Sequence, residues 1–137
     1  MILVDTGPLV ALFDPGDPDH VACRATGKRL TEELVTTIPV LTETSHLLGP
    51  ARSGLQEIGG LVSAGNLMVE FLSPELLDRM FRLMEQYRDH DMDLADASLV
   101  AAAEAHGTRR VWTLDRNDFA TYRVRRGHRF EPFEIVS

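Results

Sequence analysis

The sequence lacks the features that mark several large classes of protein. It contains a single cysteine, Cys23, so no disulfide can form within the chain and a disulfide-stapled fold is excluded. No apolar run approaches the roughly 20 residues that a membrane-spanning helix needs. The first residues show neither the positive charge nor the cleavage pattern of a secretory signal. We therefore expect a cytoplasmic protein without a membrane partner.

Motifs for nucleotide cofactors and for covalent catalysis by serine are also missing. There is no G-x-G-x-x-G or G-x-x-x-x-G-K-[ST] loop to bind phosphates, and no G-x-S-x-G turn to present a nucleophilic serine. Lys28 is the only lysine, whereas a response-regulator receiver would need a lysine late in the chain. A metal-dependent phosphatase whose first strand ends in aspartate would carry a second aspartate where Gly7 stands. A phosphatase is therefore a poor alternative.

Positive charge is scarce except near the carboxyl end of the chain. The formal net charge is −7, from 21 acidic and 14 basic residues, which argues against a nucleic-acid partner for the chain as a whole. Seven of the 14 basic residues nevertheless lie close together: Arg109, Arg110, Arg116, Arg123, Arg125, Arg126 and Arg129. This stretch is either a solvated arginine-rich edge or a surface for a polyanion, and the pattern alone does not separate the two.

The chain alternates between strand-like and helical segments. Its 137 residues, 44% of them hydrophobic, suit one globular domain that spans residues 1–137. Short apolar or β-branched runs predict strands at 2–4, 35–38, 67–72, 110–114 and within 133–136. Apolar spacing and end signals predict helices through 9–13 after Thr6-Gly7-Pro8, and at 21–30, from beyond Pro39 to about 48, 51–63, 74–87 and 93–106. Strands separated by helices predict an α/β fold whose mostly parallel sheet is covered on both faces.

Four carboxylates follow strands or lie near helix starts in this arrangement. Asp5 ends the first predicted strand, and Asp115 follows the fourth. Asp96 lies in the first turn of a predicted helix, and Glu43 lies near the start of another. In a parallel sheet the ligand site lies beyond the carboxyl ends of the strands, where all four can meet. Their mutual repulsion favours a divalent cation between them, and oxygen-only ligands suit a hard ion such as Mg²⁺ or Mn²⁺.

Each of these carboxylates also has a simpler interpretation. Asp5 alone would be a common helix cap, and Asp115 followed by Arg116-Asn117-Asp118 looks like a turn. Glu43 and His46 share a helical face, as in di-iron carboxylate bundles, but the sequence has no second Glu-x-x-His motif. The hypothesis of a metal site therefore depends on the joint placement of the four residues.

The segments around these residues closely resemble the PIN-domain ribonucleases, in particular the VapC-type toxins of bacterial toxin–antitoxin pairs. The matching segments are Leu3-Val4-Asp5-Thr6-Gly7-Pro8-Leu9, Thr42-Glu43-Thr44, Met92-Asp93-Leu94-Ala95-Asp96-Ala97-Ser98-Leu99-Val100 and Thr113-Leu114-Asp115-Arg116-Asn117-Asp118-Phe119. The resemblance covers essentially the whole chain, and the last two segments are specific. It implies a PIN-like three-layer α/β/α sandwich with a mostly parallel central sheet.

The resemblance also implies an activity, the hydrolysis of RNA phosphodiester bonds by a metal-dependent endoribonuclease. The catalytic and metal-binding residues would be Asp5, Glu43, Asp96 and Asp115, with Mg²⁺ or Mn²⁺ as cofactor. The supporting residues would be Thr6, Asp93 and Asp118. The candidates for binding RNA phosphates are Arg116, Arg123, Arg125 and Arg126. The main alternative is a non-catalytic PIN-like module that binds RNA or protein.

Two protein partners follow from the same resemblance. One is a second copy of the chain in a homodimer, and the other is an antitoxin that wraps a groove between the N-terminal helices. Apolar residues that could line this groove are Leu9, Leu12, Phe13, Leu47 and Leu48. Plain core packing is the preferred role for at least half of them.

Overall fold

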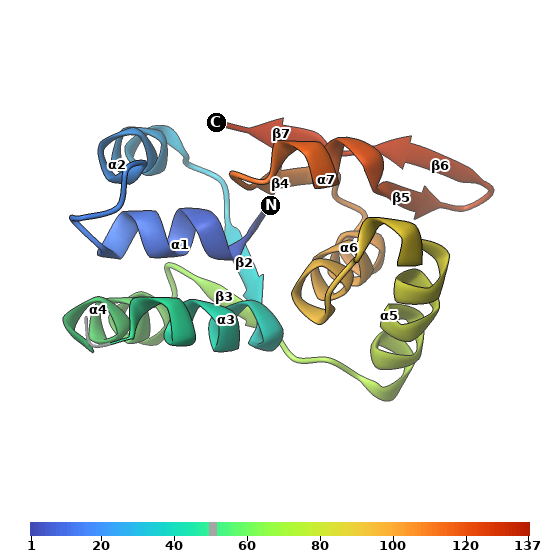
Figure 1. Ribbon diagram of the computed structural model, residues 1–137, viewed down its shortest axis with the longest axis horizontal. Coiled ribbons are helices and arrows are strands. Elements are labelled where there is room, and N and C mark those ends of the chain that lie inside the picture. Colours follow the sequence, from blue (N-terminus) through green and yellow to red (C-terminus); the bar gives the residue numbers. More distant parts are fainter. Residues whose placement is uncertain (50–51) are drawn as a thin grey trace.

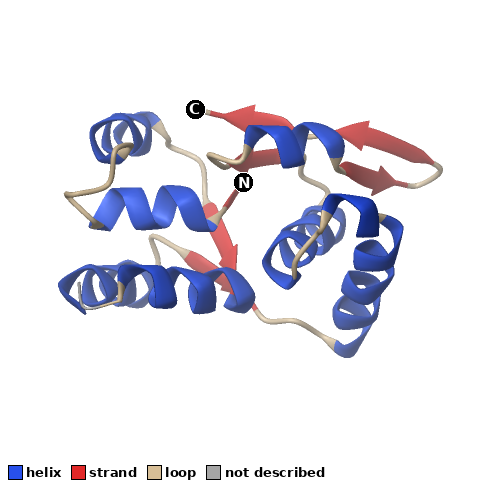
Figure 2. Cartoon of the chain, viewed as in Figure 1, coloured by secondary structure: helices blue, strands red, loops and turns tan. Residues whose placement is uncertain are grey.

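A five-stranded parallel sheet forms the centre of the computed structural model, which describes residues 1–49 and 52–137 (Figure 1, Figure 2). The strand order is β3-β2-β1-β4-β7, and each neighbouring pair is parallel. The strands are β1 (Ile2–Val4), β2 (Leu34–Thr37), β3 (Met68–Glu70), β4 (Arg110–Trp112) and β7 (Glu134–Val136). The predicted α/β fold with a mostly parallel central sheet is therefore confirmed.

Helices flank this sheet. In Figure 1, α1, α2 and α4 lie to the left of the central strands, and α5 and α6 lie to the right. The helices are α1 (Thr6–Phe13), α2 (His20–Arg29), α3 (Ile38–Leu48), α4 (Arg52–Ser63), α5 (Pro74–Gln86), α6 (Leu94–His106) and α7 (Arg116–Thr121), with a 3₁₀ turn, η1, at Arg88–His90. No helix in residues 1–49 and 52–137 is long and apolar enough to cross a membrane.

The buried core holds α6 close against the sheet. This helix is rich in alanine, and its residues from Ala97 to Ala103 are fully buried. Small side chains let a helix approach its neighbours closely, so α6 contacts both β1 and β2. The Oγ atoms of Ser98 on α6 and Thr37 at the end of β2 lie 2.6 Å apart, within hydrogen-bond distance. These contacts leave little freedom to the first turn of α6, which carries Asp96.

Several helices begin near the carboxyl edge of the sheet. Asp5 caps α1 directly after β1, Thr37 caps α3 directly after β2, and Asp115 precedes α7 after β4. Asp93 caps α6, and its Oδ1 accepts a hydrogen bond of 2.8 Å from the backbone N–H of Asp96. The positive ends of helix dipoles favour negative groups, so this edge is suited to carboxylates or bound anions.

The structure corrects two expectations and adds an element that was not predicted. α3 begins at Ile38 because Pro39 fits the first turn of a helix, so Glu43 lies in its second turn and not near its start. The segment Arg116-Asn117-Asp118, which resembled a turn, opens the short helix α7. An unexpected antiparallel hairpin joins β5 (Arg123–Arg126) to β6 (Arg129–Pro132). The predicted start of α4 at residue 51 lies outside the described residues.

Candidate functional site

The carboxylates singled out in the sequence line one pocket of about 490 Å³ at the carboxyl edge of the sheet. Its walls come from the starts of α1, α6 and α7, from the middle of α3, and from the turn after η1. The four predicted metal ligands and the three supporting residues all line it: Asp5, Glu43, Asp96, Asp115, Thr6, Asp93 and Asp118. The fold therefore brings together residues that lie up to 113 positions apart in the sequence.

Asp5 is the most enclosed of these carboxylates, with 7% of its surface exposed. Its Oδ1 accepts a hydrogen bond of 2.7 Å from the backbone N–H of Thr6, and its Oδ2 accepts one of 2.7 Å from the hydroxyl of Thr113. Burial raises the pKa of Asp5 to about 6, against these two hydrogen bonds, and the charges of Glu43 and Asp115 raise it further. Asp5 thus lies within the electrostatic reach of two other predicted ligands.

Asp96 is the second carboxylate with a strongly shifted pKa. Burial, followed by the neighbouring charge of Asp93, raises the pKa of Asp96 to about 7, and Asp5 contributes in the same direction. The phenol of Tyr122, which is fully buried, donates a hydrogen bond of 3.0 Å to Oδ2 of Asp96. Burial and the Asp96 charge in turn raise the pKa of Tyr122, so this phenol stays a donor at physiological pH.

Asp115 and Asp118 form the α7 side of the pocket. Burial, together with hydrogen bonding to Asp115 and its charge, raises the pKa of Asp118. The backbone N–H of Asp115 donates a hydrogen bond of 2.9 Å to Oγ1 of Thr113, the same hydroxyl that donates to Asp5. Thr113 therefore ties the ends of β1 and β4 together and sets the spacing between Asp5 and Asp115.

The pocket fits a hard divalent cation in its chemistry. It gathers carboxylate oxygens, and Oγ1 of Thr6 is buried there without a hydrogen-bond partner in the described part of the chain. An unpaired buried hydroxyl is costly unless a ligand or water completes its hydrogen bonding. Among the described residues, no three His, Cys, Asp or Glu side chains lie together as a ready-made metal cage. Mg²⁺ typically uses one or two carboxylates and keeps several waters, so it does not require such a cage.

Sequence reasoning missed four residues at this site. Thr113 and Tyr122 donate hydrogen bonds to Asp5 and Asp96, the two carboxylates whose pKa values are shifted most. His90, at the end of η1, and Asp91, directly after it, line the pocket. The Thr-x-Asp spacing of Thr113 and Asp115 was a usable signal, since short hydroxyl residues often bond to backbone two residues on. Tyr122 gave no comparable signal, because its partner Asp96 lies 26 residues earlier. Asp91 adopts a left-handed conformation with φ of 50°.

The four arginines proposed to bind RNA phosphates have different surroundings. The Nη1 of Arg123 donates to three backbone carbonyls at the end of α7, those of residues 120, 121 and 122, at 2.7 to 3.0 Å. Arg126 lies 3.4 Å from a carboxylate oxygen of Glu131. Arg116 and Arg125 are exposed. Arg123 therefore stabilises the connection from α7 to β5, whereas Arg116 and Arg125 are the better placed to meet a ligand from solvent.

Comparison with known proteins gives a consistent result. The family model described as "PIN domain" matches residues 2–124. The chain is 28% identical over 131 residues to "Ribonuclease VapC26" of Mycobacterium tuberculosis (strain ATCC 25618 / H37Rv), a match that covers 94% of this chain and 97% of that protein.

Two solved structures share the fold. One is Mycobacterium tuberculosis VapC20, described as a "Sarcin-Ricin loop cleaving toxin", with a TM-score of 0.78, 19% identity, and coverage of 85% of this chain and 92% of that one. The other belongs to a toxin–antitoxin complex from Klebsiella pneumoniae, with a TM-score of 0.65, 20% identity, and coverage of 88% and 92%.

Proposed function

The chain belongs to the PIN-domain family, and from this we propose that it is a metal-dependent endoribonuclease, the toxin of a type II toxin–antitoxin pair. The observation that carries the proposal is the pocket in which Asp5, Glu43, Asp96 and Asp115 meet at the carboxyl edge of the sheet. The names of the relative and of the solved neighbours, a ribonuclease and two members of toxin systems, support the same activity. We further propose that residues 1–137 form one domain.

We assign the binding of Mg²⁺ or Mn²⁺ to Asp5, Glu43, Asp96 and Asp115. A bound divalent ion supplies an activated water and stabilises the negative charge that develops on the phosphate. The hydroxyls of Thr113 and Tyr122 orient the carboxylates of Asp5 and Asp96. Asp93 holds the first turn of α6 through its N-cap, Asp118 adds negative charge beside Asp115, and Thr6 offers its unpaired hydroxyl.

The shifted pKa values couple cation binding to proton release. With pKa values of about 6 for Asp5 and about 7 for Asp96, each carboxyl group holds a proton for part of the time near neutral pH. A cation binds the ionised form, so its binding displaces these protons and strengthens as the pH rises. With a cation held by these carboxylates, the negative potential that they create would be reduced, and an RNA phosphate could approach the pocket.

We also propose two protein partners. A pocket of about 580 Å³ between α1, α2 and α4, lined in part by Leu12 and Phe13, suits an apolar segment of an antitoxin. Leu9 and Leu48 are core residues with 1% and 4% exposure, so they do not line such a groove. Leu47 is exposed and lies at the acidic pocket. A homodimer is proposed from the family resemblance, and sedimentation of the purified chain tests it.

Cleavage of RNA tests the main proposal. We would incubate the antitoxin-free protein with structured RNAs in Mn²⁺, Mg²⁺ or EDTA, beside Asp96→Asn, Asp5→Asn and the control Asp89→Asn, which changes an exposed aspartate of η1. We expect metal-dependent cleavage by the wild type and by Asp89→Asn, and none by the two site variants. Equal turnover by all four proteins would refute the assigned site. No cleavage together with no metal-dependent rise in melting temperature would favour the non-catalytic module.

A further inference from the structure

The β5–β6 hairpin presents one face to the protein and the other to solvent. Its strands are antiparallel, with Arg125 directly opposite Phe130 and Val124 opposite Glu131. Directly opposed residues share a face of a hairpin, and successive residues alternate between faces. Val124 is fully buried, so the face of Arg125 and Phe130 points the other way. Phe130 is 57% exposed there, so its ring is accessible from solvent.

The hairpin carries positive charge in an acidic protein. Between residues 123 and 132 four arginines stand against one carboxylate, Glu131, while the formal net charge of the whole chain is −7. Arg125, Arg126 and Arg129 are all exposed. A local positive potential of this kind complements a polyanion, in contrast to the acidic remainder of this chain.

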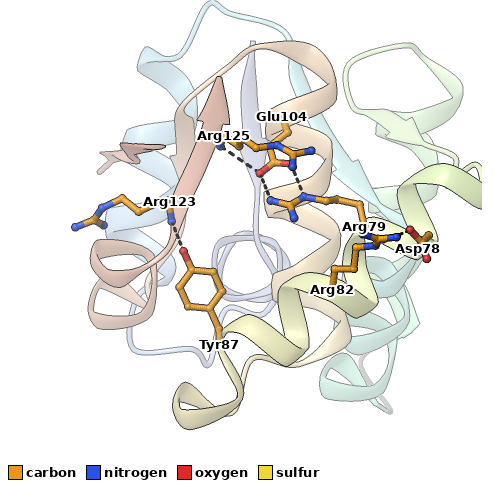
Figure 3. A network of polar contacts seen from close by, with 7 residues as sticks. All are labelled: Asp78, Arg79, Arg82, Tyr87, Glu104, Arg123 and Arg125. Carbon is orange, nitrogen blue, oxygen red and sulfur yellow. Dashed lines mark hydrogen bonds and ion pairs between the residues drawn. The ribbon is translucent and has the colours of Figure 1, made fainter. Parts of the chain in front are cut away.

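Side-chain hydrogen bonds fix the hairpin to the body of the protein (Figure 3). The backbone N–H groups of Arg123 and Arg125 donate to the hydroxyl of Tyr87, at 3.0 Å, and to Oε1 of Glu104, at 3.2 Å. Glu104 is itself held by Arg79 through two hydrogen bonds of 2.8 Å. These contacts provide hydrogen-bond acceptors for the backbone N–H groups at the outer edge of β5 and hold the hairpin in one orientation. A ligand on its solvent face therefore meets a preorganised surface.

The hairpin also begins directly after a residue that contacts the acidic pocket. Tyr122 directly precedes β5, and its hydroxyl donates to Asp96. At a rise of about 3.3 Å per residue, Arg125 lies about 10 Å along the strand from Tyr122. Figure 1 shows the hairpin extending outward from the side of the molecule where α6 and α7 lie. The hairpin therefore extends from the part of the molecule where α6 carries Asp96 and α7 follows Asp115.

We propose that the solvent face of the β5–β6 hairpin binds unpaired nucleotides of the RNA, with a base stacked on Phe130 and an adjacent phosphate held by Arg125, which lies directly opposite Phe130 on the same face. Aromatic side chains beside arginines are the common means of holding single-stranded RNA, because unpaired bases expose faces that a duplex conceals. The inference rests on the proposed ribonuclease function and adds to it the residues that would hold the nucleotides beside the cleaved bond. Residues 125–132 lie beyond the segment that the family model matches.

Binding of a short fluorescent RNA tests whether the hairpin holds unpaired nucleotides. The probe is used as a single strand and annealed to its complement, in Mg²⁺, with every protein carrying Asp96→Asn so that the RNA stays intact. We expect Phe130→Ala to weaken single-strand binding about 10-fold, in line with the usual loss of one base–aromatic stack. Phe130→Trp should retain binding, and duplex binding should change little. The matched control is Phe71→Ala, at a phenylalanine that is 76% exposed and follows β3 at the opposite edge of the sheet.

The outcomes distinguish the role of the hairpin from the ribonuclease activity. If Phe130→Ala binds the single strand as tightly as Phe71→Ala does, while the protein without Asp96→Asn still cleaves RNA with Mg²⁺, the hairpin proposal is wrong and the ribonuclease proposal stands. If Phe130→Ala instead loses binding of a protein partner and keeps that of RNA, the surface belongs to that partner and the hairpin proposal also fails. If the wild type neither cleaves nor binds any RNA, the proposed function itself fails. Melting curves of each variant verify that the fold is retained.

Discussion

Replacing Asp96 with asparagine is expected to make the metal-free protein more stable. The pKa of Asp96 is about 7 in the folded chain, chiefly because of burial and the charge of Asp93, against about 3.9 for an aspartate in an unfolded chain. A difference of about three units corresponds to about 4 kcal/mol of unfavourable free energy when the group is ionised. Partial access of the side chain to solvent screens its charge, so we expect a gain of about 2 kcal/mol. Asparagine keeps an oxygen that can accept the hydrogen bond from Tyr122.

The pH dependence of this gain has a definite sign. Above pH 7 the carboxyl group is ionised in both states, and only the folded state pays for its burial. As the pH falls through 7, the folded protein takes up a proton while the unfolded chain stays ionised down to about pH 4. The free energy of unfolding of the wild type therefore rises relative to that of Asp96→Asn as the pH falls from 8 to about 4. The advantage of the variant is greatest above pH 7 and disappears near pH 4.

Thermal melting with EDTA at several pH values measures the effect. At pH 8 the melting temperature of Asp96→Asn should exceed that of the wild type by about 7 °C, and near pH 4 the two should coincide. Saturating Mg²⁺ should raise the melting temperature of the wild type and change that of Asp96→Asn much less. The control Asp89→Asn should have the melting temperature of the wild type under every condition. A variant that melts below the wild type at pH 8 in EDTA would refute the view that this carboxylate is held at a cost.

Two further predictions concern Tyr122 beside the pocket and the arginine on the solvent face of the hairpin. Tyr122→Phe should weaken Mn²⁺ binding at pH 7 about 10-fold by calorimetric titration, because Asp96 loses a charge-assisted hydrogen bond; an unchanged Kd would show that the phenol does not position Asp96. Arg125→Ala should reduce the slope of log K against log salt for single-stranded RNA by about 0.7, as expected for one lost phosphate contact. Arg82→Ala on α5 is the control, and an unaltered slope in Arg125→Ala would show that the RNA binds elsewhere.

Much of the fold could be predicted from the sequence because the central strands are short and apolar. Ile2, Leu3 and Val4 are fully buried between neighbouring strands, and such strands appear in a sequence as unbroken apolar runs. The alanine-rich segment that ends at Gly107 likewise predicted α6, and Gly107 adopts the left-handed conformation expected after a helix. The rule that ligands bind at the carboxyl ends of parallel strands then led to the carboxylates that line the pocket.

The parts that escaped prediction depend on contacts between distant residues. The hairpin has little apolar alternation, since Val124 is its one buried residue. The backbone N–H groups at the free edge of β5 donate to side chains, those of Tyr87 after α5 and Glu104 on α6, rather than to another strand. α7 is six residues long, too short for a helical period to stand out. Nothing in the sequence sets Tyr122 apart, and only the fold brings its hydroxyl to Asp96.

Two buried carboxylates of this chain show how differently the protein neutralises negative charge. Glu104, with 10% of its side chain exposed, is paired with Arg79 through two hydrogen bonds, which is the usual structural solution for a buried acid. Asp5 is no more exposed, yet its side chain meets a hydroxyl and a backbone N–H, and no arginine or lysine is among the described residues that line its pocket. Hydroxyls orient a carboxylate but leave its charge in place. The remaining charge must be met by a proton or by a cation from solution, and the pocket can take up either, as the proposed metal-dependent activity requires.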